Sequence, residues 1–126
     1  MGWEMYITRT EHAWDGESNP ILAEEWIQYV NNDPELSFSP INGPYHVIWR
    51  GDEINWLDWH TGNISAKSPA QALYCKMLDI AAALNAKVRD DDGNLYLSPD
   101  DLLNPSWAKK EISPSFLQKI ITYFRK

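Results

Sequence analysis

The sequence lacks most features of secreted, membrane-spanning or nucleic-acid-binding proteins. Cys75 is its only cysteine, so no internal disulfide can form, and a reducing compartment is expected. No stretch approaches the ~20 apolar residues of a membrane span, and the first residues lack the basic start of a signal peptide. The formal net charge of −7 opposes binding to nucleic acids and anionic membranes, which are themselves negative. We therefore expect a cytoplasmic protein with no nucleic-acid or membrane partner.

Signatures of catalysis are missing as well. The chain has no glycine-rich phosphate loop, no Gly-x-Ser-x-Gly motif, and none of the His-Glu or paired-Cys metal motifs. Asp90, Asp92 and Asn94 match positions one, three and five of a calcium loop, but Gly93 then falls at position four, and position twelve is Asp101. A hairpin turn explains these residues better. The sequence thus predicts no enzyme, no cofactor and no metal site.

Three polar residues keep one alternative open. Asp58 and His60 share a face of a predicted strand at ~6–7 Å separation, and His46 lies in the neighbouring predicted strand. They could form an acid–base pair or two metal ligands, although spacing fixes no third ligand. The alternative function is a small-ligand-binding or hydrolytic domain that uses His46, His60 and Asp58.

Acidic residues and tryptophan, by contrast, are concentrated in one half of the chain. Eleven of the eighteen carboxylates fall within residues 1–63, where Arg9 and Arg50 are the only formal cations. Six of the seven tryptophans lie in the same half. Acidic surfaces that carry exposed aromatic side chains suit the capture of a basic protein partner.

Length and patterning predict a single domain over residues 1–126. Alternating apolar residues and turn signals predict strands at 5–9, 36–41, 45–50, 53–59, 63–67, 87–89 and 95–97. Helical spacing and Ser-Pro starts predict helices at about 20–31, from Ser68 to Asn85, a short one at Ser98, and a last one from Ser113. This order predicts an α+β fold, a mostly antiparallel meander sheet with helices on one face and C-terminal helices.

The hairpin around Gly51 decides which aromatic side chains share a face. A two-residue loop at Gly51-Asp52 suits a type II′ turn. In that register one face carries Tyr45, Val47, Trp49, Ile54, Trp56 and Asp58, and the other carries His46, Ile48, Asn55, Leu57 and Trp59. Either the last helix covers the first set as core, or that set is a contact surface with tryptophan and tyrosine anchors.

Several segments together resemble a set of small stand-alone bacterial proteins of uncharacterised function. The shared segments are 5–9, 19–21, 24–26, 58–59, 62–64, 72–78 and 91–93, so the resemblance spans about residues 5–97. They are strand, cap and turn elements, and they imply no catalytic residue. In size, acidity and α+β build the chain is also similar to the immunity proteins of polymorphic toxin systems.

We therefore expect an antitoxin-like immunity protein that occludes the active site of a basic toxin. The predicted anchors are the aromatic residues Tyr45, Trp49 and Trp56. The predicted steering carboxylates are Asp15, Glu17, Glu24, Glu25, Asp52, Glu53 and Asp58.

Overall fold

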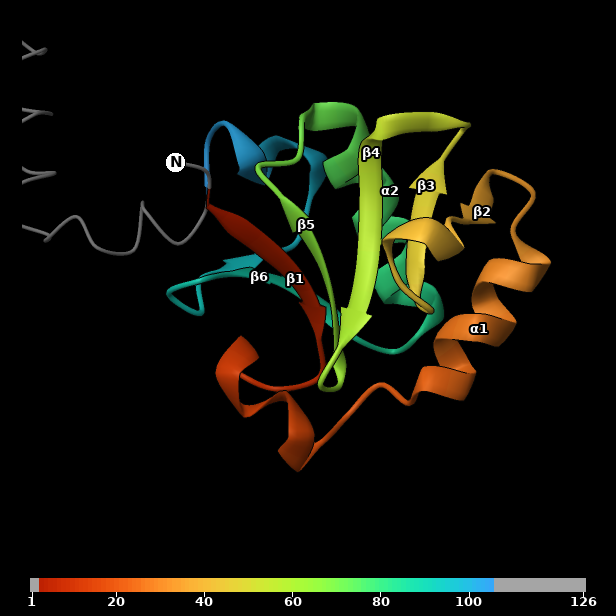
Figure 1. Cartoon of the computed structure of the whole chain (residues 1–126). Coiled ribbons are helices and arrows are strands. Elements are labelled where there is room, and N and C mark those ends of the chain that lie inside the picture. The colour runs from red at the N-terminus through yellow and green to blue at the C-terminus, as the bar shows by residue number, and fades with distance from the viewer. Residues whose placement is uncertain (1–2, 106–126) are drawn as a thin grey trace, which may run out of the picture.

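The computed structural model describes residues 3–105. The helix predicted from Ser113 therefore lies outside the described residues. The strands are β1 (Glu4–Thr8), β2 (Leu36–Phe38), β3 (His46–Trp49), β4 (Asp52–His60), β5 (Asn63–Lys67), β6 (Lys87–Asp90) and β7 (Leu95–Tyr96). The helices are α1 (Ala23–Asn32) and α2 (Gln71–Ala83), with short 3-10 helices η1 (Ala13–Ser18), η2 (Pro40–Asn42) and η3 (Pro99–Leu102) (Figure 1).

The seven strands form one antiparallel sheet in the order β2-β3-β4-β5-β1-β6-β7. The predicted α+β class with a mostly antiparallel sheet is confirmed. Strands β2 to β5 form the expected meander, since each pairs with the next one along the chain. Strand β1 lies between β5 and β6 and ties the two ends of the described chain together, a pairing that local turn signals cannot reveal.

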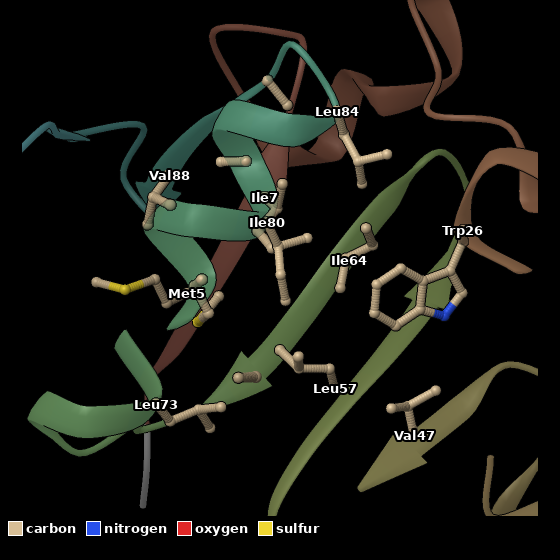
Figure 2. Close-up of a cluster of buried hydrophobic side chains, with 14 of the residues drawn as sticks. Met5, Ile7, Trp26, Val47, Leu57, Ile64, Leu73, Ile80, Leu84 and Val88 are labelled. Carbon is tan, nitrogen blue, oxygen red and sulfur yellow. The ribbon is translucent and has the colours of Figure 1, made fainter. Parts of the chain in front are cut away.

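Both helices pack on the same face of the sheet and close the hydrophobic core there. Helix α2 lies behind the strands in Figure 1, and α1 lies beyond β2. Trp26 of α1 is fully buried and reaches toward Val47 and Ile64 (Figure 2), while Ile80 of α2 covers Ile7. Within residues 3–105, no helix combines the length and apolarity needed to span a membrane.

The β3–β4 hairpin differs from the predicted one. Its two-residue loop is Arg50-Gly51, both with positive φ (58° and 72°), and Trp49 pairs with Asp52. A bulge follows, because Ile48 already pairs with Trp56. The Asp52 carboxylate stabilises the bulge by accepting the Ile54 N–H at 2.9 Å. The predicted register is therefore wrong, and the residues of β4 face the opposite side from the one expected relative to β3.

The start of α2 also departs from the prediction. The helix begins at Gln71, and Ser68 does not cap it. Ser68 instead has a φ of 44°, and its N–H donates at 2.7 Å to the carbonyl oxygen of Trp3, the residue before β1. Two other predictions are confirmed: Asn85 has a left-handed conformation after the helix, with a φ of 54°, and Ser98 is the N-cap residue of η3, where its N–H donates to the Asp101 carboxylate at 3.1 Å.

Candidate partner-binding site

Two of the three predicted aromatic anchors lie on the covered face of the sheet. Trp49 is buried with 5% of its surface exposed, and its indole N–H donates to Glu35 at 3.2 Å. Tyr45 packs edge-on against Trp59 at 4.9 Å between ring centres and lies against the core. Neither side chain is a free surface anchor, because Trp49 is part of the hydrophobic core and Tyr45 packs against it.

Trp56 lies on the other face of the sheet. It is half-buried there, and its ring stacks on His46 at 5.4 Å. The register shift thus separates Trp56 from Trp49, which were expected to share one face.

Two of the predicted carboxylates have structural partners. Glu25 makes a bidentate pair with Arg9, at 2.9 and 3.0 Å, and accepts the Leu22 N–H at 2.8 Å at the start of α1. The hydrogen bonds from Arg9 and Leu22 hold the pKa of Glu25 below its usual value. Asp52 is the carboxylate that stabilises the hairpin bulge. These two side chains therefore hold local structure.

The predicted carboxylates are split between two ends of the molecule. Asp52 and Glu53 begin β4, whereas His60 ends it, ~26 Å away at ~3.3 Å per residue. Glu24 belongs to the His60 end, because it shares a surface cleft with Thr61 and Gly62. The predicted acidic surface is therefore not continuous.

Asp58 and the two histidines of the alternative hypothesis do share one face. Asp58 pairs directly across from His46, and His60 follows two residues later on the same strand. Burial raises the pKa of Asp58, and the two histidines oppose this shift. Among residues 3–105, no group of three or more metal-ligating side chains could hold a metal ion.

The open face of the sheet, which neither α1 nor α2 covers, carries a polar row across five strands. His46, Asp58, Ser65, Tyr6 and Arg89 are successive cross-strand neighbours. Directly paired residues point to the same side of a sheet, so these five side chains line one face.

A cleft of about 350 Å³ opens on this face where η1 meets the sheet. We call it the η1 cleft; its lining residues are Glu4, Tyr6, Ala13, Trp14, His60, Thr61, Asn63, Ser65 and Asp91. They come from β1, η1, the β4–β5 hairpin and the β6–β7 turn.

Two carboxylates converge on one hydroxyl in the η1 cleft. The Tyr6 hydroxyl lies 2.9 Å from Glu4 Oε2 and 3.1 Å from Asp91 Oδ1. A phenol has one proton, so it donates to only one of the two at a time. Burial, reinforced by the two carboxylates, raises the pKa of Tyr6, so the hydroxyl stays protonated.

Glycine allows η1 to form the wall of this cleft. A Cβ on Gly16 would lie 2.7 Å from the Thr61 carbonyl oxygen, and one on Gly62 would lie 2.7 Å from the Gly16 carbonyl oxygen. Gly62 also has a φ of +89° in the β4–β5 turn. The backbones of η1 and this turn therefore approach more closely than side chains would permit.

A second cleft of about 370 Å³ adjoins the first at Thr61, and we call it the α1 cleft. Its lining residues are Glu17, Pro20, Ile21, Leu22, Ala23, Glu24, Trp59, Thr61 and Gly62. Two exposed apolar side chains mark this end of the molecule, Trp14 at 79% and Leu22 at 51%. Thr61 of the β4–β5 turn lines both clefts, and we call this end of the molecule the η1 end.

Sequence reasoning missed Glu4, Tyr6, Trp14 and Asp91 as site residues. Tyr6 and Asp91 are 85 positions apart and meet only because β1 pairs with β6. The only local signal was the i, i+2 spacing of Glu4 and Tyr6, which places both on one face of a strand.

Comparisons with protein-family models, with curated proteins and with solved structures found no match to this chain.

Proposed function

We propose that this protein is a non-enzymatic binding protein that captures a basic protein partner through its η1 end. The observation that carries the proposal is the exposed pair Trp14 and Leu22 among exposed carboxylates. Asp15 and Glu17 follow Trp14 in η1, and Glu24 lies in the first turn of α1, just after Leu22. An aromatic anchor surrounded by carboxylates suits an interface with a positively charged partner.

The charge balance of the described residues supports the same proposal. Residues 3–105 hold 17 carboxylates and six formal cations. Three of those cations, Arg9, Arg50 and Lys76, are already paired with carboxylates of the protein. The net excess of negative charge would accelerate the approach of a basic partner at low salt.

The more specific proposal is an immunity protein that occludes the active site of a cognate toxin in the cytoplasm. Its mechanism is steric: carboxylates of the η1 end steer a cationic cleft toward the protein, and Trp14 supplies the desolvated contact. Steering sets mainly the association rate, and desolvated aromatic contacts set mainly the dissociation rate.

A pair of charge-reversed variants tests the proposal. The first carries Asp15→Lys, Glu17→Lys and Glu24→Lys at the η1 end. The second reverses three exposed carboxylates elsewhere, Glu53→Lys, Asp79→Lys and Asp100→Lys, so both have the same net charge. The protein encoded next to this gene is expressed, and its association with each variant is measured by surface plasmon resonance together with relief of growth arrest.

We expect the η1-end variant to associate at least about ten-fold more slowly and the matched variant to bind much as the unmodified protein does. Trp14→Ala should speed dissociation. Equal losses in both charge variants would contradict a localised interface, and a neighbouring protein that causes no growth arrest would contradict the immunity role.

A second candidate is the small-ligand or hydrolytic domain that uses His46, His60 and Asp58. Its support is the placement of Asp58 across from His46, with a carboxyl pKa raised by burial. A general acid of this kind would give a pH-dependent hydrolysis of p-nitrophenyl esters that Asp58→Asn abolishes. A rate equal to that of the uncatalysed reaction would dismiss this candidate.

A further inference from the structure

The η1 cleft is rich in hydrogen-bond acceptors. Glu4 and Asp91 present carboxylates, and Tyr6 and Ser65 present hydroxyl oxygens from the floor of the sheet. Within residues 3–105 neither Glu4 nor Asp91 forms an ion pair. The ligand that such a lining accommodates best is a hydrogen-bond donor with positive charge.

A buried side chain in the same cleft points to a missing donor independently. Asn63 is buried, with 5% of its surface exposed, and its Nδ2 donates to the Ala13 carbonyl oxygen at 2.6 Å. Its Oδ1 has no hydrogen-bond partner among the described residues. Buried amide oxygens are almost always paired, so an unpaired one beside a cleft marks a place for a donor.

The aromatic side chains of the η1 cleft narrow the chemistry of that donor. Trp14 offers a largely exposed indole from η1, and His12 stacks on one of its faces at 5.1 Å between ring centres. An indole face attracts cations, and planar guanidinium groups stack on it while donating to carboxylates in their own plane. A lysine ammonium group cannot stack in this way.

We propose that the η1 cleft binds the guanidinium group of one arginine of the basic partner, between Glu4, Asp91 and Trp14. This proposal rests on the proposed function, because the arginine belongs to the basic partner protein inferred there. Asp91 Oδ2 already accepts the Glu4 N–H at 3.0 Å, and the Tyr6 hydroxyl lies within reach of both carboxylates. The guanidinium donates to the acceptor positions that remain on the two carboxylates, and its plane lies against the indole.

Titration with a single capped amino acid tests the site without any partner protein. N-acetyl-arginine amide is added to the full chain, and binding is followed by NMR through the Trp14 indole N–H and the Asn63 side-chain amide. N-acetyl-lysine amide and N-acetyl-glutamine amide are the charged and neutral comparison probes. We expect saturable shifts at both reporters with arginine, weaker ones with lysine and none with glutamine.

Three variants and one matched control locate the binding. Glu4→Gln and Asp91→Asn keep an acceptor for Tyr6 while removing one charge each, and each should weaken arginine binding at least about three-fold. Trp14→Ala removes a side chain that is 79% exposed, so the variant folds, and should weaken binding about three- to five-fold. The control, Glu53→Gln with Asp79→Asn, removes two charges outside the cleft and should bind as before.

Two results would overturn the assignment. One is an absence of saturable shifts at Trp14 and Asn63. The other is an equal loss of binding in the control and the cleft variants, which would indicate unspecific attraction to the acidic surface. If the neighbouring protein still binds through the η1 end under either result, only the arginine site is refuted and the proposed function stands.

Discussion

The two faces of the sheet treat the same kinds of side chain differently. At the covered face, Glu35 accepts hydrogen bonds from Lys76 at 2.8 Å and from Trp49, and Arg50 pairs with it from the hairpin. Asp33 accepts a second bond from Lys76 at 2.7 Å. At the open face, Glu4 and Asp91 share the single proton of Tyr6, and Asp91 also accepts the Glu4 N–H at 3.0 Å. The carboxylates of the covered face therefore have cationic partners within the described residues, whereas Glu4 and Asp91 have none there.

The largest expected contrast concerns two tryptophans of the same hairpin. Trp49→Ala should lower the free energy of unfolding by ~3–5 kcal/mol, because it empties a buried site of the core. Trp56→Ala should cost only about 1–2 kcal/mol, since the ring is half-buried and loses mainly its stack on His46. Urea denaturation of both variants measures the difference.

Equal costs for the two tryptophans would contradict the register of the β3–β4 hairpin. In the predicted register Trp49 and Trp56 shared a face, and both would have been core or both surface. Trp59→Ala serves as a check, because Trp59 lies on the covered face and donates to the Ile21 carbonyl oxygen at 2.7 Å. It should resemble Trp49 more than Trp56.

The second contrast concerns charge. Lys76→Met should cost ~2–3 kcal/mol, since it leaves Asp33 and Glu35 without their shared cation in a site where Lys76 and Asp33 are only 11% and 12% exposed. Asp91→Asn should change stability by no more than ~0.5 kcal/mol, because it keeps an acceptor and removes repulsion from Glu4. Chemical denaturation at neutral pH tests both. A large loss in Asp91→Asn would mean that the cleft carboxylates are structural.

Much of the fold was predictable because its signals are local. Strand β5 was predicted at its observed bounds, Asn85 has the left-handed conformation that its residue type favours, and Ser98 lies at the predicted N-cap of η3. The prediction of the β3–β4 turn was wrong because Arg50 adopts a positive φ, which an arginine does not indicate in a sequence. The prediction that Ser68 caps α2 was wrong because Ser68 bonds instead to Trp3, which is 65 positions away. The residues of the candidate site were not predicted for the same reason: Glu4, Trp14 and Asp91 come together only when β1 pairs within the sheet.

The third contrast concerns acid. Hydrogen bonds from Lys76, then from Trp49 and Arg50, lower the pKa of Glu35 to about 2 from 4.5. Burial opposes the same shift at Asp33, yet its bonds from Lys76, the Glu35 N–H and Tyr29 lower that pKa too. A carboxyl whose pKa is lower in the folded protein stabilises it fully above about pH 5, and this contribution disappears as the pH falls toward 2. Melting temperatures of Glu35→Gln should therefore depend less on pH in this range.

Asp58 on the open face should behave in the opposite sense. Burial raises its pKa, so ionisation costs more in the folded than in the unfolded protein. The destabilisation is absent below the unfolded pKa and grows as the pH rises through the folded pKa. Asp58→Asn should consequently raise the melting temperature at pH 7 and leave it unchanged at pH 3. A higher melting temperature of Asp58→Asn at both pH values would show that ionisation of Asp58 is not the cause of the destabilisation.

The smallest expected effect is that of a chelator, which should leave the melting temperature unchanged. The acidic turn after β6 resembles a calcium loop in composition. However, the Asp90 carboxylate already accepts hydrogen bonds from groups of the protein. Its Oδ1 accepts the N–H groups of Asp92 and Asn94, at 2.9 and 3.0 Å, and its Oδ2 accepts the Tyr96 hydroxyl at 2.9 Å. These bonds hold the turn closed without a cation. EDTA should therefore change nothing, whereas Asp90→Ala should destabilise the protein equally with and without calcium. A chelator-induced drop of several degrees, reversed by calcium or zinc, would show that the turn or the His46–Asp58–His60 group binds metal after all.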